Sequence, residues 1–202
     1  MPHQHDRRFD PSKLARLDSE QRRLRTPPEA IRAAAEPFAG KRVADVGAGA
    51  GFFSFALLDA PEPPAQVDAI DVSPELLAAL ADRLRTHRYG ERVRPLCAPA
   101  EALPLENGAV HLVMLGMVLH ELDDAAAGLR EAHRALAEDG RILIVDWDRP
   151  DDATGEPEAG PPYAQRTPKA AARVLLEQAG FHDLRSHDGF QLVYALTARR
   201  RR

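Results

Sequence analysis

Hydrophobic residues along this chain gather in short apolar runs, and longer amphipathic segments separate most of these runs. The runs have the length and the Val, Ile and Leu content of β-strands. The predicted strands are residues 43–46, 67–71, 92–97, 110–115, 141–147, 181–186 and 191–198. The fourth run is almost wholly apolar, which is typical of a central strand buried on both faces.

The segments between the runs repeat apolar residues at helical spacing and begin at residues that cap helices. Ser73-Pro74 and Thr167-Pro168 each place an N-cap residue before a proline, and Asp123 or Asp124 begins a further helix. A helix over 52–58 follows the first strand. Strands that alternate with helices predict the α/β class, with an open, doubly wound and mostly parallel sheet.

Residues 1–40 precede the first strand and predict a helical extension of the domain formed by residues 41–202. Asp10-Pro11 predicts the start of one helix. Thr26-Pro27-Pro28-Glu29 has the pattern of a capping box for a second helix, which Gly40 ends. We expect this extension to pack over the edge of the core domain through an apolar stripe of Ile31, Ala34, Ala35 and Phe38.

Composition and charge exclude several classes of protein. A chain of 202 residues with 44% hydrophobic and 29% charged residues suits one globular α/β domain. Its net charge of −4 gives no overall attraction to nucleic acid or to an anionic membrane. No apolar run approaches the roughly 20 residues of a membrane span, and the N-terminus lacks a signal-peptide core. We therefore expect a cytoplasmic protein that binds neither nucleic acid nor membrane.

No metal site is expected. Cys97 is the single cysteine, which excludes a disulfide within the chain and any multi-cysteine metal site. Four histidines lack the context of metal ligands, namely His3, His5, His182 and His187.

The first predicted strand ends in Asp45 and runs into a turn with glycine at alternate positions, Gly47, Gly49 and Gly51. Such a turn lets backbone N–H groups approach a ligand closely, and the following helix points its N-terminus at the same place. The dinucleotide fingerprint needs a third glycine one position later, where Phe52 stands. A carboxylate at Asp45 would repel a pyrophosphate but suits a ligand that carries an ammonium group.

Asp45-x-Gly47-x-Gly49-x-Gly51 resembles motif I of the class I S-adenosylmethionine-dependent methyltransferases, and the resemblance extends over residues 41–198. It implies a Rossmann-like sheet of seven strands in which the last strand inserts antiparallel beside the fifth. It also implies that the glycine backbone holds the methionine part of S-adenosylmethionine and that Asp45 faces its α-ammonium group.

Further cofactor contacts follow from the same resemblance. Asp71 ends the second strand at the spacing where an acidic side chain reaches ribose hydroxyls, with Val72 beside it. Family members often carry an acid where this chain has Pro99, so the Ala100 N–H is left to serve the adenine ring. The remaining expected contacts are Glu101 after the third strand, and Leu115 and Gly116 at the end of the fourth strand beside the sulfonium.

His120 and Glu121 follow the fourth strand, at the carboxyl edge where open α/β sheets place their substrates. An imidazole there can accept a proton from a nucleophile, although orientation alone supplies much of the rate of methyl transfer. We expect His120 to be catalytic or to contact the substrate, together with Glu121. Tyr163 and Arg166, in the loop after the fifth strand, are further candidates for the substrate site.

The leading interpretation is methyl transfer from S-adenosylmethionine to a small-molecule acceptor, with release of S-adenosylhomocysteine. One alternative is a non-enzymatic or regulatory protein that binds the cofactor and has lost the acceptor site. A nicotinamide-dependent oxidoreductase is less favoured, because it would need the third glycine and a Tyr-x-x-x-Lys relay that Tyr89, Tyr163 and Tyr194 do not form. The sequence leaves the acceptor atom and the oligomeric state open.

Overall fold

The computed structural model describes residues 18–201, which form a seven-stranded sheet in the order β3-β2-β1-β4-β5-β7-β6. Six strands run parallel, and β7 lies antiparallel between β5 and β6. The strand bounds are β1 Arg42–Val46, β2 Gln66–Asp71, β3 Val93–Cys97, β4 Val110–Gly116, β5 Leu136–Trp147, β6 Phe181–His187 and β7 Val193–Arg200. The predicted fold class is confirmed, including the antiparallel last strand.

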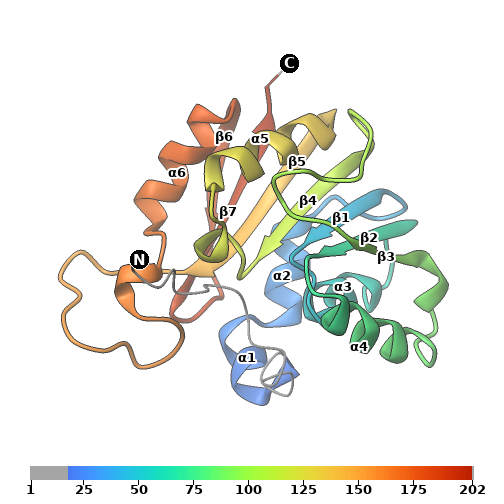
Figure 1. The fold of residues 1–202 in the computed structure, drawn as a ribbon, viewed down its shortest axis with the longest axis horizontal. Coiled ribbons are helices and arrows are strands. Elements are labelled where there is room, and N and C mark those ends of the chain that lie inside the picture. The colour runs from blue at the N-terminus through green and yellow to red at the C-terminus, as the bar shows by residue number, and fades with distance from the viewer. Residues whose placement is uncertain (1–17, 202) are drawn as a thin grey trace, which may run out of the picture.

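Helices cover both faces of the sheet (Figure 1). On one face α2 and α3 share a hydrophobic cluster with the central strands, and α4 packs beside α3 against β2 and β3. On the other face α5 and α6 do the same. The helix bounds are α1 Glu20–Arg25, α2 Pro28–Ala35, α3 Phe52–Leu58, α4 Pro74–Leu84, α5 Ala125–Ala135 and α6 Lys169–Gln178.

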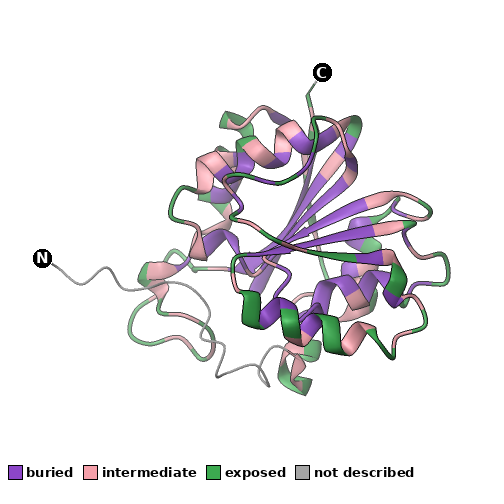
Figure 2. Ribbon diagram, turned by 45° about the vertical axis from the view of Figure 1, so that its right-hand side comes forward, coloured by how far each residue is buried: buried purple, intermediate pink, exposed green. Residues whose placement is uncertain are grey.

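The central strands are the most deeply buried part of the molecule, and exposed residues are concentrated on the outer faces of the helices, in loops and on the edge strands β3 and β6 (Figure 2). Side chains alternate across the sheet. In β5, Leu143 and Val145 belong to the cluster under α2 and α3, whereas Ile142 and Ile144 belong to the cluster under α5 and α6. This two-sided burial explains why the central strands read as continuous apolar runs.

The fifth strand begins earlier than predicted. β5 starts at Leu136, not at Arg141, and Glu138-Asp139-Gly140, a sequence that favours a turn, lies inside it. Leu136 pairs with Val110 and Arg141 pairs with Leu112, so the pairing register shifts between these two points. The extra residues are absorbed as a bulge within the ladder. Pairing with β4 therefore overrides the local preference of Glu138-Asp139-Gly140 for a turn.

The predicted capping box at Thr26 is wrong. The Thr26 hydroxyl donates to the carbonyl oxygen of Arg22 at 2.8 Å and so closes the end of α1. The next helix begins at Pro28 without a side-chain cap. It ends at Ala35 and not at Gly40, since Pro37 follows closely.

The predicted apolar residues are buried in one cluster: Ile31, Ala34 and Ala35 lie in α2, and Phe38 follows the end of the helix. The helix expected at Asp10-Pro11 lies outside the described residues. The division of the chain at residue 40 stays a prediction.

Candidate functional site

The glycine turn has the backbone geometry that its sequence predicts. Gly47, Gly49 and Gly51 have φ angles of 69°, 54° and 88°, in the left-handed region that favours glycine. Gly51 is the N-cap of α3. The turn is anchored to β2, because the N–H groups of Gly47 and Ala48 both donate to the carbonyl oxygen of Ile70. The N-terminus of α3 is thereby held at the carboxyl edge of the sheet.

Two glycines at this edge are also required by packing. A Cβ on Gly47 would lie 2.1 Å from Cγ2 of Val118, and a Cβ on Gly116 would lie 2.1 Å from Cε2 of Phe53. Leu115 is 1% exposed, so its side chain belongs to the core. The predicted contacts of Leu115 and Gly116 with the cofactor would therefore come from their backbone.

Asp71 lies between the glycine turn and the start of α4. Its Oδ2 accepts from the N–H of Gly49 at 2.8 Å, and its Oδ1 accepts from the N–H of Ser73 at 2.9 Å. Each carboxylate oxygen keeps a lone pair for a further donor, such as a hydroxyl group. Val72, the next residue, is 43% exposed, which is unusual for a large hydrophobic side chain in this structure. The carboxylate of Asp71 and the exposed apolar side chain of Val72 are thus neighbours at the end of β2.

Asp45 is fully buried beneath the turn. Its Oδ2 accepts from the hydroxyl of Ser54 at 2.6 Å, whereas its Oδ1 has no hydrogen-bond partner among the described residues. Burial raises the pKa of Asp45 to about 6. A buried carboxylate oxygen without a donor is costly, and an ammonium group would supply both the donor and the opposite charge.

Arg22 reaches the same region from α1 and was not predicted from the sequence. Its guanidinium carbon lies 4.7 Å from the ring centroid of Phe52, the first residue of α3. Burial lowers the pKa of Arg22 to about 10, against the opposing influence of Asp45. Nothing in the sequence distinguishes Arg22 from the neighbouring arginines, so only the tertiary structure identifies it.

His120 is held by Asp146, a second residue that the sequence analysis did not include in the site. The two residues are buried, with His120 Nδ1 2.6 Å from Asp146 Oδ1, and the backbone N–H of His120 donates to Asp146 Oδ2 at 3.1 Å. Glu121 Oε1 lies 3.7 Å from Nε2 of the same imidazole. Asp146 is the one charged residue in the apolar half of β5, Ile142–Trp147, a signal that was available in the sequence.

The pKa of His120 is the result of opposing influences. Burial by itself lowers this pKa, but the charge of Asp146 and its hydrogen bond raise it, and the net shift is upward. Glu121 acts in the same direction as Asp146, whereas the guanidinium of Arg166 opposes both. The arrangement is a basic imidazole with one nitrogen fixed by a carboxylate.

Arg166 fastens the loop after β5. It donates to the carbonyl oxygens of Pro161 and Asp148 at 2.9 Å each, and also to that of Ala159. Its guanidinium stacks on the rings of Trp147 and Tyr163. These contacts account for its burial, and the substrate roles predicted for Arg166 and Tyr163 stay predictions.

The loop between β3 and β4 covers the sheet beside the end of β2. Ala100 is buried in the cluster that also contains the core of α5, and Glu101 is half-buried next to it. The N–H of Leu103 donates to Glu131 of α5, which fixes the loop to the body of the protein. The predicted contacts of Ala100 and Glu101 with the adenine end of the cofactor stay predictions.

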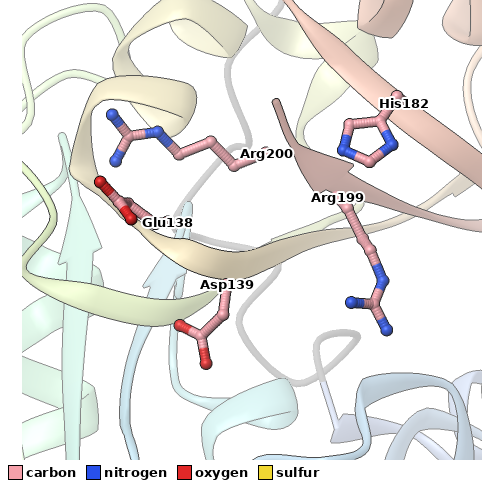
Figure 3. A pocket seen from close by; sticks show the side chains of 5 residues that line it. All are labelled: Glu138, Asp139, His182, Arg199 and Arg200. Carbon is pink, nitrogen blue, oxygen red and sulfur yellow. The ribbon is translucent and has the colours of Figure 1, made fainter. Parts of the chain in front are cut away.

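A separate hollow lies away from these residues. It has a volume of about 410 Å³ and is lined by Glu138, Asp139, His182, Arg199 and Arg200, around the amino end of β5 (Figure 3). Its acidic and basic groups offset one another, and it is at the edge of the sheet opposite His120. Within residues 18–201, no three His, Cys, Asp or Glu side chains are grouped so as to hold a metal ion.

The inserted antiparallel strand, the glycine turn and the acids that end β1 and β2 define the class I methyltransferase domain. The family profile described as "Methyltransferase domain" matches residues 44–144, half of the chain. The chain belongs to this family, whose cofactor is S-adenosylmethionine and whose product is S-adenosylhomocysteine.

Individual relatives agree with this membership. A ubiquinone/menaquinone biosynthesis C-methyltransferase of Geotalea uraniireducens is 31% identical over 113 residues, which cover 55% of this chain and 47% of that protein. The uncharacterized methyltransferase YcgJ of Bacillus subtilis is 32% identical over 118 residues, covering 58% and 45%. The match thus spans about half the length of these curated relatives.

A solved structure covers more of the chain. The crystal structure of a SAM-dependent methyltransferase from Aquifex aeolicus has a TM-score of 0.83 and 26% identity, and covers 96% of this chain and 100% of that chain. None of the helices formed by residues 18–201 has both the length and the apolar character that crossing a bilayer requires.

Proposed function

We propose that this protein transfers a methyl group from S-adenosylmethionine to a small-molecule acceptor whose nucleophilic atom carries a proton. Family membership supports the cofactor and the reaction class. The buried His120–Asp146 pair at the carboxyl edge of the sheet is the observation that carries the proposal about the acceptor. The cytoplasmic location expected from the sequence stays a prediction.

The acids at the edge of the sheet fit the cofactor. Asp45 Oδ1 is a buried oxygen that has no donor among residues 18–201, and the α-ammonium group of the cofactor would satisfy it. Asp71 has a lone pair on each oxygen for the ribose hydroxyls, since the backbone N–H groups of Gly49 and Ser73 take only one site on each. Val72 offers an exposed apolar surface to the base.

When bound, the cofactor supplies an electrophilic methyl group on a sulfonium sulfur. The protein orients the acceptor and takes its proton. The carboxylate of Asp146 accepts a hydrogen bond from Nδ1–H of His120, which leaves Nε2 to accept a proton from the acceptor. The imidazolium that results is stabilised by Asp146 and by Glu121, 3.7 Å from Nε2.

This arrangement favours acceptors that must lose a proton, such as phenols, quinols, thiols and amines. The relative from Geotalea uraniireducens is named as a C-methyltransferase of quinone biosynthesis. We infer the small-molecule class of acceptor from such names. The acceptor panel described next identifies the nucleophilic atom.

The test combines binding with turnover. Calorimetry with S-adenosylhomocysteine should detect binding to the wild type, and a methyl-labelled cofactor should label at least one acceptor of a panel from the four classes above. His120→Ala should slow transfer about 100-fold or more at unchanged affinity for S-adenosylhomocysteine. His182→Ala, which changes an exposed histidine of β6, is the matched control and should leave the rate unchanged.

Each failure has its own meaning. Absence of binding at high micromolar S-adenosylhomocysteine would remove the proposal. Binding without label in any acceptor class would favour the non-enzymatic cofactor-binding alternative. Equal rates for the wild type and His120→Ala would remove the proton-accepting role of His120.

A further inference from the structure

The two loops that follow β4 and β5 are strongly acidic. Because β4 and β5 are parallel neighbours, residues 117–124 and 148–168 both leave the sheet at its carboxyl edge, next to each other. Together they contain eight acidic residues and two arginines, so their net charge is more negative than the −4 of the whole chain. Groups of one sign raise the local concentration of ligands of the opposite sign. The edge that carries His120 therefore attracts cations.

The arginines beside these loops are engaged with the protein itself. Arg166 donates to three carbonyl oxygens of its own loop, and its guanidinium carbon lies 5.1 Å from the ring centroid of Trp147. The guanidinium carbon of Arg25 lies 5.3 Å from the same centroid, and Arg149 is exposed. These cations reduce the negative field of the two loops and leave it negative.

Glu121 lies beside the proton-accepting nitrogen of His120. Its Oε1 is 3.7 Å from Nε2, while Asp146 holds Nδ1 at 2.6 Å. A nitrogen with two or more N–H groups can donate one to Nε2 and another to the carboxylate of Glu121. A hydroxyl or a thiol has a single hydrogen and can donate to only one of them. The pair therefore suits a ligand atom that is a multiple donor.

Charge distinguishes the possible acceptors further. A phenol, quinol or thiol becomes an anion when Nε2 takes its proton, and that anion would lie next to the carboxylate of Glu121. An ammonium ion becomes neutral in the same step and meets no repulsion. Like charges repel strongly at such distances in a partly buried site. Glu121 thus disfavours acceptors that react as anions.

A buried hydroxyl near the same pair has no partner. Tyr194 of β7 is directly opposite Asp146 of β5, so the two side chains lie on one face of the sheet. Tyr194 is 4% exposed, and its hydroxyl has no hydrogen-bond partner among residues 18–201. Burial and the charges of Asp146 and Asp148 raise its pKa, so the hydroxyl stays protonated. The lone pairs of its oxygen remain for a further N–H donor.

We propose that the methyl acceptor is an amine, which binds as its ammonium ion with one N–H on Nε2 of His120 and another on the carboxylate of Glu121. This inference rests on the proposed function, because it assumes that His120 is the proton acceptor. An alkylamine is an ammonium ion at neutral pH, as the lysine side chain is. Nε2 takes one of its protons, and the freed nitrogen lone pair forms the N–C bond. The electron pair of the broken C–S bond stays on sulfur, and the methylated product is again an ammonium ion.

The test extends the acceptor panel with matched compounds, in which an amine and a thiol share one carbon skeleton, as phenethylamine and phenethyl thiol do. Glu121→Gln keeps the size of the side chain and removes its charge. At saturating cofactor, kcat/KM for amines should fall about 10-fold, the lower end for a hydrogen bond to a charged group. For thiols it should stay within about twofold or rise, because the repulsion is removed. A purely structural role of Glu121 would lower both alike.

Glu138→Gln is the matched control, because it makes the same change at an exposed position near the amino end of β5. It should leave both values within about twofold. A second measurement uses the wild type alone: between about 0.05 M and about 0.5 M salt, kcat/KM should fall about threefold or more for amines and stay nearly constant for uncharged thiols.

Several outcomes would overturn the inference. Label found in phenols, quinols or thiols but in no amine would do so, and so would equal losses for amine and thiol in Glu121→Gln. If Glu121→Gln does not fold, the salt dependence decides, and equal dependence for the two classes means that the acceptor is not an ammonium ion. Absence of label in every class counts instead against the proposed function.

Discussion

At the scale of single residues, the site is built from charged groups whose partners come from distant parts of the chain. His120 and Asp146 are 26 positions apart, yet their side chains meet at 2.6 Å. Tyr194 lies on the neighbouring strand opposite Asp146, and burial raises the pKa of its hydroxyl. A buried imidazole that keeps an elevated pKa depends on the carboxylate beside it, because burial alone would lower that pKa.

This dependence gives a pH prediction. The neutral imidazole is the proton acceptor, so the rate should fall as the pH drops below the pKa of His120, which lies above the usual value of about 6.5. Asp146→Asn removes the largest influence that raises the pKa of His120 and leaves the burial that lowers it. The acid limb of the pH–rate profile should therefore move to lower pH, and the plateau rate should fall about 10- to 100-fold because the imidazole loses its orientation.

The measurement is kcat against pH with any acceptor that the panel identifies. Glu121 and Arg166 remain in the variant, so their opposing influences on the His120 pKa are unchanged. If the acid limb of the pH–rate profile does not move in Asp146→Asn, a group other than His120 controls that limb.

At the scale of elements, the glycine turn serves two purposes that can be separated. Positive φ angles require glycine for conformational reasons, and Val118 requires it at Gly47 for reasons of space. Gly155 has a φ of 70°, close to the 69° of Gly47, but nothing lies within 4 Å of the position that its Cβ would occupy. The two glycines form a matched pair in which only the packing differs.

Gly155→Ala should cost about 1 kcal/mol of unfolding free energy from backbone strain alone. Gly47→Ala should cost about 2–4 kcal/mol, because overpacking against Val118 adds to the same strain. Urea unfolding of both variants measures the difference. Adding Val118→Ala to Gly47→Ala should recover part of the loss, and equal costs for the two single variants would show that Val118 moves aside freely.

At the scale of the whole molecule, the fold buries a carboxylate, Asp45, of which one oxygen has no hydrogen-bond donor among residues 18–201. The pKa of Asp45 is raised from 3.8 to about 6, so the folded protein binds this proton more tightly than the unfolded chain does. Its contribution to stability is therefore largest below about pH 4 and is lost as the pH rises to about 6. A cofactor whose ammonium group pairs with the ionised carboxylate offsets this cost at neutral pH.

S-adenosylhomocysteine at 100 times its Kd should raise the melting temperature at pH 7 by about 5–10 °C, from about 2.7 kcal/mol of binding linkage in a domain of this size. At pH 5 and the same ligand concentration the increase should be smaller, because Asp45 must first lose its proton. Asp45→Asn should bind more weakly at pH 7 and should lose most of the difference between the two pH values. An increase that is independent of pH in the wild type would contradict the pairing of Asp45 with the ammonium group.

Much of the fold was predictable because it is encoded in short stretches. The helix over Phe52–Leu58 has the predicted bounds, and β1, β2 and β4 differ by one residue at an end. The errors fall where distant pairing overrides a local signal: the turn-like Glu138-Asp139-Gly140 is absorbed into β5 because it bulges against β4. Thr26 has the sequence of an N-cap but bonds backwards to α1.

The sequence by itself determined the class of this protein. Glycine spacing and apolar periodicity depend on φ angles and on burial of one segment at a time, and Asp45, Asp71 and the glycine turn could be found from them. Only the tertiary structure decided that Asp146 holds His120 and that Arg22 packs on Phe52 at the start of α3. Those pairings depend on how strands and helices remote in the chain are brought together at one edge of the sheet, and no local pattern records that arrangement.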